Sequence, residues 1–276
     1  MDLRKLDVDE ILRMATPRSK PFLAPTEEQR AVIQAPLEPL LVVAGAGAGK
    51  TTTMSQRVLY MVAHHGIDPE RILGLTFTRK AAGELGLKMR QDLATLASNS
   101  GQEFVGEPTA LTYNSFAARI LGEYGATIGV DPDSRLIGQA QQVQVLSSIV
   151  ENWRGEYPQS DEQYKPTATI VAAVLSLSGH IAEQNMTLDD GRIALSAFQK
   201  ELEEVASISG KEPTGNLKKM IEANRNRLLL LDIAEAFESY KRAHGLIDFS
   251  DQLLLATQIV TSNKDVVRQV RSDYQA

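Results

Sequence analysis

The sequence predicts an α/β protein in which a parallel sheet domain carries a phosphate-binding loop and is interrupted by an all-helical insertion. Three observations support this fold class. Short apolar runs alternate with helical patterns three times before residue 116, an order typical of parallel strands joined by crossover helices. A glycine cluster follows directly after the first apolar run. From residue 116 onward the periodicity is helical, and no convincing strand precedes residue 245.

The first elements are a lead-in, a capped helix and a strand. Residues 1–25 are charged and punctuated by prolines, so we expect a loose lead-in with a short helix from Val8 to Met14. The stretch Thr26-Glu-Glu-Gln29 has the spacing of a capping box, which predicts that a helix opens here. Residues 40–44 are continuously apolar and partly β-branched, which predicts a buried central strand. A helix should follow from Lys50 to about His64.

The later elements follow from the same patterns. Apolar runs at residues 72–77 and 109–113 predict two further strands. Helices are expected over residues 79–97, 116–128, 139–153, 168–183, 188–205, 217–244, 248–260 and from 264 onward. We therefore expect a first part of the sheet domain at 26–115, a helical insertion at 116–244 and a return to the sheet domain at 245–276.

Composition and charge exclude several function classes. The chain has 276 residues and no cysteine, which excludes disulfide frameworks, cysteine-ligated metal sites and cysteine nucleophiles within them. There is no long apolar run and no apolar signal core, so we expect a cytoplasmic protein without a membrane partner. The net charge of −6 argues against bulk electrostatic binding of nucleic acid. The acidity is concentrated in residues 116–244, with 13 basic and 18 acidic side chains, whereas residues 1–115 hold 13 of each.

The segment from Ala44 to Thr51 predicts a nucleotide site between a strand and a helix. Gly47 and Gly49 lack β-carbons, so backbone N–H groups can turn inward around an anion at the positive end of the helix. Lys50 brings a charge to the phosphates, and the Thr51 hydroxyl is a suitable Mg²⁺ ligand, so these two are the candidate catalytic residues. The strict pattern has glycine where this chain has Ala44. The expected nucleotide-binding residues of this segment are Gly45, Ala46, Gly47, Ala48, Gly49, Lys50, Thr51 and Thr52.

The loop alone leaves the reaction open. A GTPase should carry an Asn-Lys-x-Asp segment, and the nearest candidate, residues 263–266, ends in valine, which disfavours guanine recognition. A small-molecule kinase would need no long helical insertion. An unrelated phosphate-loop transferase and a non-catalytic nucleotide- or DNA-binding assembly module stay as alternatives.

Five stretches, in this order along the chain, resemble the superfamily 1A DNA helicases of the UvrD/Rep family. They are Thr26-Glu-Glu-Gln-Arg, Ala44 to Thr53, Thr76-Phe-Thr-Arg-Lys-Ala-Ala, Thr112-Tyr-Asn-Ser-Phe-Ala and Gly245-Leu-Ile-Asp-Phe-Ser-Asp-Gln-Leu-Leu. The glycine loop is generic, whereas the third stretch is specific and counts against a transferase. The resemblance covers the chain outside the lead-in. It implies a RecA-like motor domain with an inserted helical subdomain, and ATP with Mg²⁺ as cofactors.

The resemblance also implies roles for individual residues. Gln29 matches the family's adenine-reading glutamine, whose amide offers one donor and one acceptor to the purine edge. Two segments match those that contact single-stranded DNA, where hydroxyls and a guanidinium suit phosphates and rings suit base stacking. They consist of Thr76, Phe77, Thr78, Arg79, Thr112, Tyr113 and Asn114. Phe77 is also the last residue of an apolar run, so burial in the core is the alternative to a role in DNA binding. Many relatives have histidine at the position of Asn114, and several have arginine at that of Thr52.

Two groups of charged residues lie outside the predicted nucleotide site. We expect Asp248 and Asp251 to cap the helix expected at residues 248–260 rather than to form a paired-carboxylate site. The apolar stripe of this helix should pack onto the sheet. A basic cluster is either a patch for duplex DNA or a solvated helix surface. Its members are Lys211, Lys218, Lys219, Arg225 and Arg227.

The Asp-Glu strand end that orders Mg²⁺ and water in this family is not found. The nearest stretch, Asp273-Tyr-Gln, lacks the preceding apolar strand and the second carboxylate. We therefore expect the first motor domain and insertion of a longer ATP-dependent DNA helicase. Alone it should hydrolyse little ATP, and its partners would be single-stranded and duplex DNA and the remaining motor domain.

Overall fold

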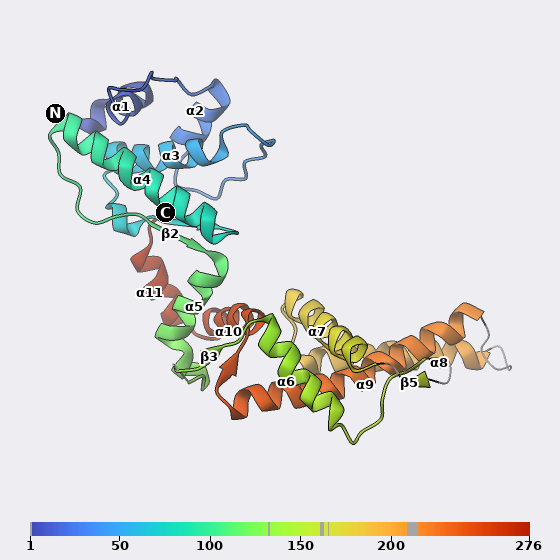
Figure 1. Cartoon of the computed structure of the whole chain (residues 1–276). Helices are drawn as coiled ribbons and strands as arrows, with labels where there is room; N and C mark the ends of the chain where they lie inside the picture. Colours follow the sequence, from blue (N-terminus) through green and yellow to red (C-terminus); the bar gives the residue numbers. More distant parts are fainter. Residues whose placement is uncertain (1, 132, 161–162, 165, 209–214) are drawn as a thin grey trace. The chain divides into compact units, whose positions relative to one another are not determined.

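The computed structural model describes residues 2–131, 133–160, 163–164, 166–208 and 215–276, which form two units (Figure 1). Unit 1 comprises Met1–Phe116 and Ser262–Ala276, and unit 2 comprises Ala117–Thr261. The described residues are mostly helical with a few short strands. None of their helices is both long enough and apolar enough to cross a membrane.

Unit 1 begins with two capped helices. The 3₁₀ turn η1 (Leu3–Lys5) leads to α1 (Val8–Met14), whose N-cap Asp7 and Glu10 form a capping box. Helix α2 (Glu27–Gln34) opens with the expected capping box of Thr26 and Gln29. The helix expected from Val8 to Met14 is confirmed. The description of the lead-in as loose is wrong for residues 3–15, whereas residues 17–24 are irregular and mostly exposed. Leu3, Val8, Ile11, Leu12 and Ala15 are all buried in the core of unit 1.

Two parallel strands and two long helices form the centre of unit 1. Helix α3 (Lys50–His65) is followed by the 3₁₀ turn η2 (Pro69–Arg71), strand β1 (Leu73–Thr76), helix α4 (Arg79–Ser100) and strand β2 (Thr109–Thr112). The strands pair in parallel, from Leu73 with Thr109 to Thr76 with Thr112. Both strands end at the same edge, so the segments that follow them are neighbours. The parallel pairing expected for these two runs is confirmed.

The strand expected at residues 40–44 is wrong for this structure. The segment is irregular, and Leu41 and Val43 are 88% and 90% exposed. A continuous apolar run becomes a central strand only when neighbouring strands bond its backbone groups and cover both faces. In the described part of the chain β1 has other neighbours: it pairs with β2, and Leu73 N donates to Ala276 O (2.8 Å) in the segment after helix α11 (Lys264–Asp273). The same segment bonds the turn before β1, where Gln275 N donates to Arg71 O (2.8 Å).

Unit 2 is a group of helices with short strand pairs. Its elements are the end of α5 (Tyr113–Tyr124), η3 (Gly125–Ile128), β3 (Arg135–Leu136), α6 (Gln139–Glu151), β4 (Gln159–Ser160), β5 (Gln163–Tyr164), α7 (Thr167–Glu183), α8 (Leu188–Ile208), α9 (Gly215–Ala243), β6 (Leu246–Ile247) and α10 (Phe249–Ser262). Strand β3, which the sequence analysis missed, pairs in parallel with β6. The core contains apolar side chains of α6, α7 and α9, with Trp153 packed against it.

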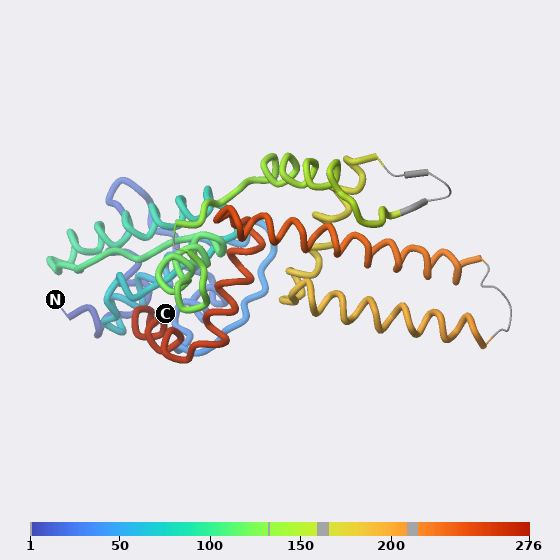
Figure 2. Tube along the Cα trace, turned by 90° about the horizontal axis from the view of Figure 1, so that it is seen from below, coloured from blue at the N-terminus to red at the C-terminus, as the bar shows by residue number. Residues whose placement is uncertain are grey.

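Helices α8 and α9 lie side by side along much of their length (Figure 2). The buried Asn224 of α9 joins them by donating to Leu195 O at 2.9 Å and to Gln199 Oε1 at 3.0 Å. Helix α10 lies in unit 2 up to Thr261. Its residues Ala256 and Ile259 are buried, and the expectation that its apolar stripe packs onto the sheet stays a prediction.

Candidate nucleotide and nucleic-acid site

The glycine loop turns directly into helix α3. Gly47 and Gly49 have φ angles of +78° and +77°, a left-handed conformation that residues with a β-carbon rarely adopt. Gly49 is the N-cap of α3, so no side chain caps the first turn. The N-terminal N–H groups of a helix without such a cap are suited to an anion. The loop thus holds Gly47 and Gly49 in a conformation that favours glycine.

Lys50 and the threonines after it form the first turn of α3. Lys50 Nζ donates to Gly45 O at 2.7 Å and to Ala44 O at 3.3 Å, so the ammonium group lies across its own loop. Thr51 and Thr52 are exposed beside it. These bonds use exposed carbonyls, and a phosphate oxygen would replace them with a charge-assisted contact. Within the described residues, no group of three or more His, Asp or Glu side chains is arranged to hold a metal ion.

Gln29 links helix α2 to the loop. Its Oε1 accepts from Thr26 N at 3.0 Å, and its Nε2 donates to Ala48 O at 3.2 Å. A β-carbon on Gly49 would lie 3.1 Å from the same Nε2, which shows how closely the amide approaches the loop. The residue predicted to read adenine is therefore placed beside the predicted phosphate site.

The two predicted DNA-contacting segments lie side by side after β1 and β2. Phe77 is 90% exposed, so the alternative that this ring is buried in the core is wrong. Its centroid lies 5.3 Å from that of Tyr113, which is 46% exposed, at an interplanar angle of 49°. Two exposed aromatic rings at one sheet edge can stack nucleic-acid bases.

The other residues of these segments divide into exposed and engaged groups. Arg79 and Asn114 are exposed. Thr78 caps α4 by accepting from Ala81 N at 3.1 Å. Thr76 donates to Thr78 O at 3.1 Å, and the buried Thr112 hydroxyl lies 2.8 Å from Ser115 Oγ. The three threonine hydroxyls thus shape the turns that present the rings and Arg79.

The basic cluster of the insertion is partly neutralised by acidic neighbours. Lys211 lies outside the described residues. On α9, Lys218 and Arg225 lie 3.9 Å from Glu222 and Glu203, and their side chains are exposed. Surface ion pairs of this kind contribute at most about 1 kcal/mol to stability. The cluster can therefore still be either a patch for duplex DNA or a solvated helix surface.

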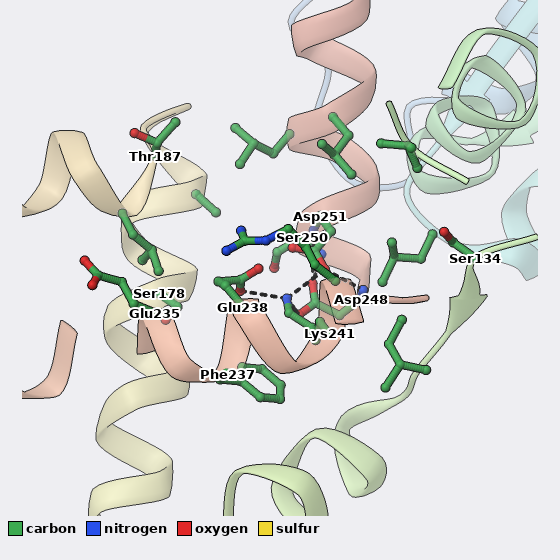
Figure 3. A pocket seen from close by; sticks show the side chains of 18 of the residues that line it. Ser134, Ser178, Thr187, Glu235, Phe237, Glu238, Lys241, Asp248, Ser250 and Asp251 are labelled. Carbon is green, nitrogen blue, oxygen red and sulfur yellow. Dashed lines mark hydrogen bonds and ion pairs between the residues drawn. The ribbon is translucent and has the colours of Figure 1, made fainter. Parts of the chain in front are cut away.

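Unit 2 contains a buried charged cluster that the sequence analysis missed. Lys241 of α9 is 2% exposed, and its Nζ lies 2.7 Å from Glu238 Oε1, 2.9 Å from Asp248 Oδ2 and 2.7 Å from Asp251 Oδ2 (Figure 3). Asp248 Oδ1 accepts from Asp251 N, and Asp251 Oδ2 accepts from Asp248 N. The capping roles predicted for the two aspartates are confirmed, and the same carboxylates also bind the lysine.

Burial and mutual repulsion change the pKa values of this cluster. Burial raises the pKa of Glu238 to about 6, with the charge of Asp251 adding to it and Lys241 opposing it. Burial raises the pKa of Asp251 as well. For Lys241, burial would lower the pKa, but Asp251, Glu238 and Asp248 together outweigh it and raise the value. Three carboxylates around one ammonium thus favour uptake of a proton by the carboxylates.

The cluster forms one side of a cavity in unit 2. The cavity has a volume of about 820 Å³ and is lined by parts of α7, α9, β6 and α10, with the cluster at its wall (Figure 3). Because each polar group of the cluster has a partner in the chain, the cluster serves to hold the α9, β6 and α10 corner together.

Comparison with known proteins assigns the family. The model of the UvrD/REP helicase N-terminal domain matches residues 25–276. The match covers most of the chain, which therefore belongs to this family.

Individual relatives agree with this assignment. The chain is 24% identical over 248 residues to the ATP-dependent DNA helicase PcrA of Leuconostoc citreum, covering 90% of this chain and 27% of the relative. It is 35% identical over 120 residues to the ATP-dependent DNA helicase UvrD2 of Mycobacterium tuberculosis, covering 43% of this chain and 17% of the relative. It is 30% identical over 124 residues to DNA helicase II of Haemophilus influenzae, covering 45% and 16%. The chain thus spans about a quarter or less of the length of these relatives.

Proposed function

We propose that this chain is the ATP- and single-stranded-DNA-binding region of an ATP-dependent DNA helicase, built on a RecA-like motor domain with an inserted helical subdomain. The observation that carries the proposal is the loop of residues 44–51, where two left-handed glycines and an uncapped helix start meet the amide of Gln29. The family relationship supports it, because the relatives above are named as ATP-dependent DNA helicases.

The residues of the loop have distinct roles in this proposal. The N–H groups at the start of α3 hold the phosphates, and Lys50 leaves Gly45 O to pair with them. Thr51 supplies a hydroxyl oxygen to Mg²⁺, and Gln29 places its amide against the adenine edge. When bound, ATP with Mg²⁺ would supply the electrophilic phosphoryl group, and these side chains would hold it in position.

The DNA surface lies at the ends of β1 and β2. Phe77 and Tyr113 offer faces for base stacking, while Arg79 and Asn114 reach phosphates or base edges. The loop and these segments lie in unit 1, so nucleotide binding and DNA binding share one sheet and its helices. Changes in one site can then be transmitted to the other through α4 and the strands, which suits ATP-driven movement along DNA.

A binding assay with labelled single-stranded DNA tests the DNA surface. Phe77→Ala should weaken binding about 5- to 150-fold, as expected for loss of about 1–3 kcal/mol of stacking. Phe198→Ala is the matched control, since Phe198 is also partly exposed but lies on α8 in unit 2. Equal affinity of wild type and Phe77→Ala in fluorescence anisotropy would contradict the DNA assignment.

A further inference from the structure

The N-terminal segment of residues 2–16 lies outside the part that the family model matches, yet it is built into unit 1. The matched region begins at residue 25. Leu3, Val8, Ile11 and Leu12 are at most 3% exposed and pack with side chains of α3 and α4. Asn99 of α4 also donates to Met14 O at 2.7 Å, so the end of α1 is fixed to α4. The segment therefore has a fixed place against the helices that carry the nucleotide loop.

Helix α1 holds α2 through a charged contact. Arg30 Nη2 lies 2.9 and 3.0 Å from the two carboxylate oxygens of Asp9, and about a third of each side chain is exposed. The hydrogen bond that Arg30 donates to Asp9 raises the pKa of Arg30. Arg30 directly follows Gln29, the residue whose amide lies on the loop. The contact is thus one residue from the predicted adenine reader.

Adjacent positions on a helix point about 100° apart, so fixing one sets the direction of the other. The Asp9 contact restrains rotation of α2 about its axis at Arg30. At the opposite end of α2, Arg57 of α3 donates to Val32 O at 2.6 Å, Ala35 O at 2.9 Å and Pro36 O at 3.0 Å, which prevents sliding. With both restraints present, the Gln29 amide lies where its Oε1 accepts from Thr26 N and its Nε2 donates to Ala48 O.

We propose that Asp9 is a positioning residue for the nucleotide site: by holding Arg30, it sets the rotation of α2 and so the placement of Gln29 over the loop. The inference rests on the proposed function, since it assumes that the loop binds ATP. It adds a role for a segment that precedes the family's matched region.

The test is discrimination between bases, measured as the ratio of affinities for fluorescent ATP and GTP analogues on the whole chain. In wild type ATP should bind more tightly, and Gln29→Ala should reduce the ratio toward one. Asp9→Asn removes the charge with little change of shape, and should lower the ratio about 2- to 10-fold, as for a weakened hydrogen bond. Affinity for the GTP analogue should change little, because the phosphate contacts are intact.

Two further variants separate positioning from loss of folding. Asp7→Ala removes the capping box of the same helix and leaves the Asp9–Arg30 contact in place, so it should lower the melting temperature and leave the ratio unchanged. The double variant Asp9→Arg, Arg30→Asp keeps opposite charges at the two positions. Its ATP-to-GTP affinity ratio should therefore be closer to the wild-type value than that of Asp9→Asn.

Each outcome has a defined meaning. If wild type binds neither nucleotide, the proposed function fails and this inference falls with it. If wild type prefers ATP and Gln29→Ala abolishes the preference while Asp9→Asn keeps it, only the inference is overturned. An equal loss in Asp7→Ala and Asp9→Asn, or no recovery in the double variant, would also overturn it, since the effect would then be general destabilisation.

Discussion

Replacing Glu238 by glutamine should raise the free energy of unfolding of unit 2 at pH 7.5 and change it little at pH 4.5. Glu238 is 26% exposed and shares Lys241 with Asp248 and Asp251. Glutamine keeps the shape and can still accept a hydrogen bond from Lys241 Nζ. It removes the charge whose burial beside Asp251 is unfavourable.

The size of the effect follows from the pKa of Glu238. Folding raises this pKa from 4.5 to about 6. The folded state therefore binds the proton more tightly, and this stabilisation is complete below pH 4.5 and is lost as the pH rises through 6. A difference of about 1.5 units corresponds to about 2 kcal/mol. In the variant the side chain at position 238 is neutral at every pH. Above pH 7 its free energy of unfolding should therefore exceed that of wild type by up to this amount.

Urea unfolding followed by the fluorescence of Trp153 measures this difference in unit 2. Trp153 is the sole tryptophan of the chain and packs against the core of unit 2. Glu235→Gln is the matched control on the same helix, because Glu235 pairs with Arg192 at the surface and should show no pH-dependent gain. If Glu238→Gln is less stable than wild type at pH 7.5, the ionised carboxylate stabilises the cluster and the reasoning is refuted.

Three other substitutions test the packing and the loop. Lys241→Met leaves three buried or partly buried carboxylates without a cation and should lower the unfolding free energy by about 3–5 kcal/mol in the same urea assay. Ile11→Ala, at a side chain that is 0% exposed, should lower it by about 2–5 kcal/mol, measured by circular dichroism; no change would mean that α1 is not part of the core. Gly49→Ala should strain the left-handed cap by about 1–2 kcal/mol and push against the Gln29 amide, which should weaken binding of a fluorescent ATP analogue.

Local signals predicted most of the helices. The capping box at Thr26 predicted one helix start, and the structure adds a capping box at Asp7 and a cap at Thr78, which likewise depend on side chains within one turn. The loop geometry at Gly47 and Gly49 follows from residue type for the same reason. The burial of residues 2–16 had a signal too, because Val8, Ile11, Leu12 and Ala15 have helical spacing.

The remaining features depend on partners that are distant in sequence. The apolar run at residues 40–44 encodes a preference for burial, but the position of neighbouring strands decides whether burial is achieved. Lys241 lies in a periodic helix and looks like any surface lysine. Its partners Asp248 and Asp251 come near it only because the chain turns through β6 into α10. The pairing of β3 with β6 likewise joins segments on either side of the helical core.

Titration of a fluorescent ATP analogue with Mg²⁺ into wild type and Lys50→Ala tests the central claim most directly. We expect saturable binding in wild type and an affinity at least about 10-fold weaker in Lys50→Ala, the loss expected for a hydrogen bond to a charged group. Circular dichroism should show the variant folded, and Lys219→Ala, an exposed lysine of α9, should bind as wild type does. Equal affinity of wild type and Lys50→Ala would contradict the assignment of the loop as the nucleotide site.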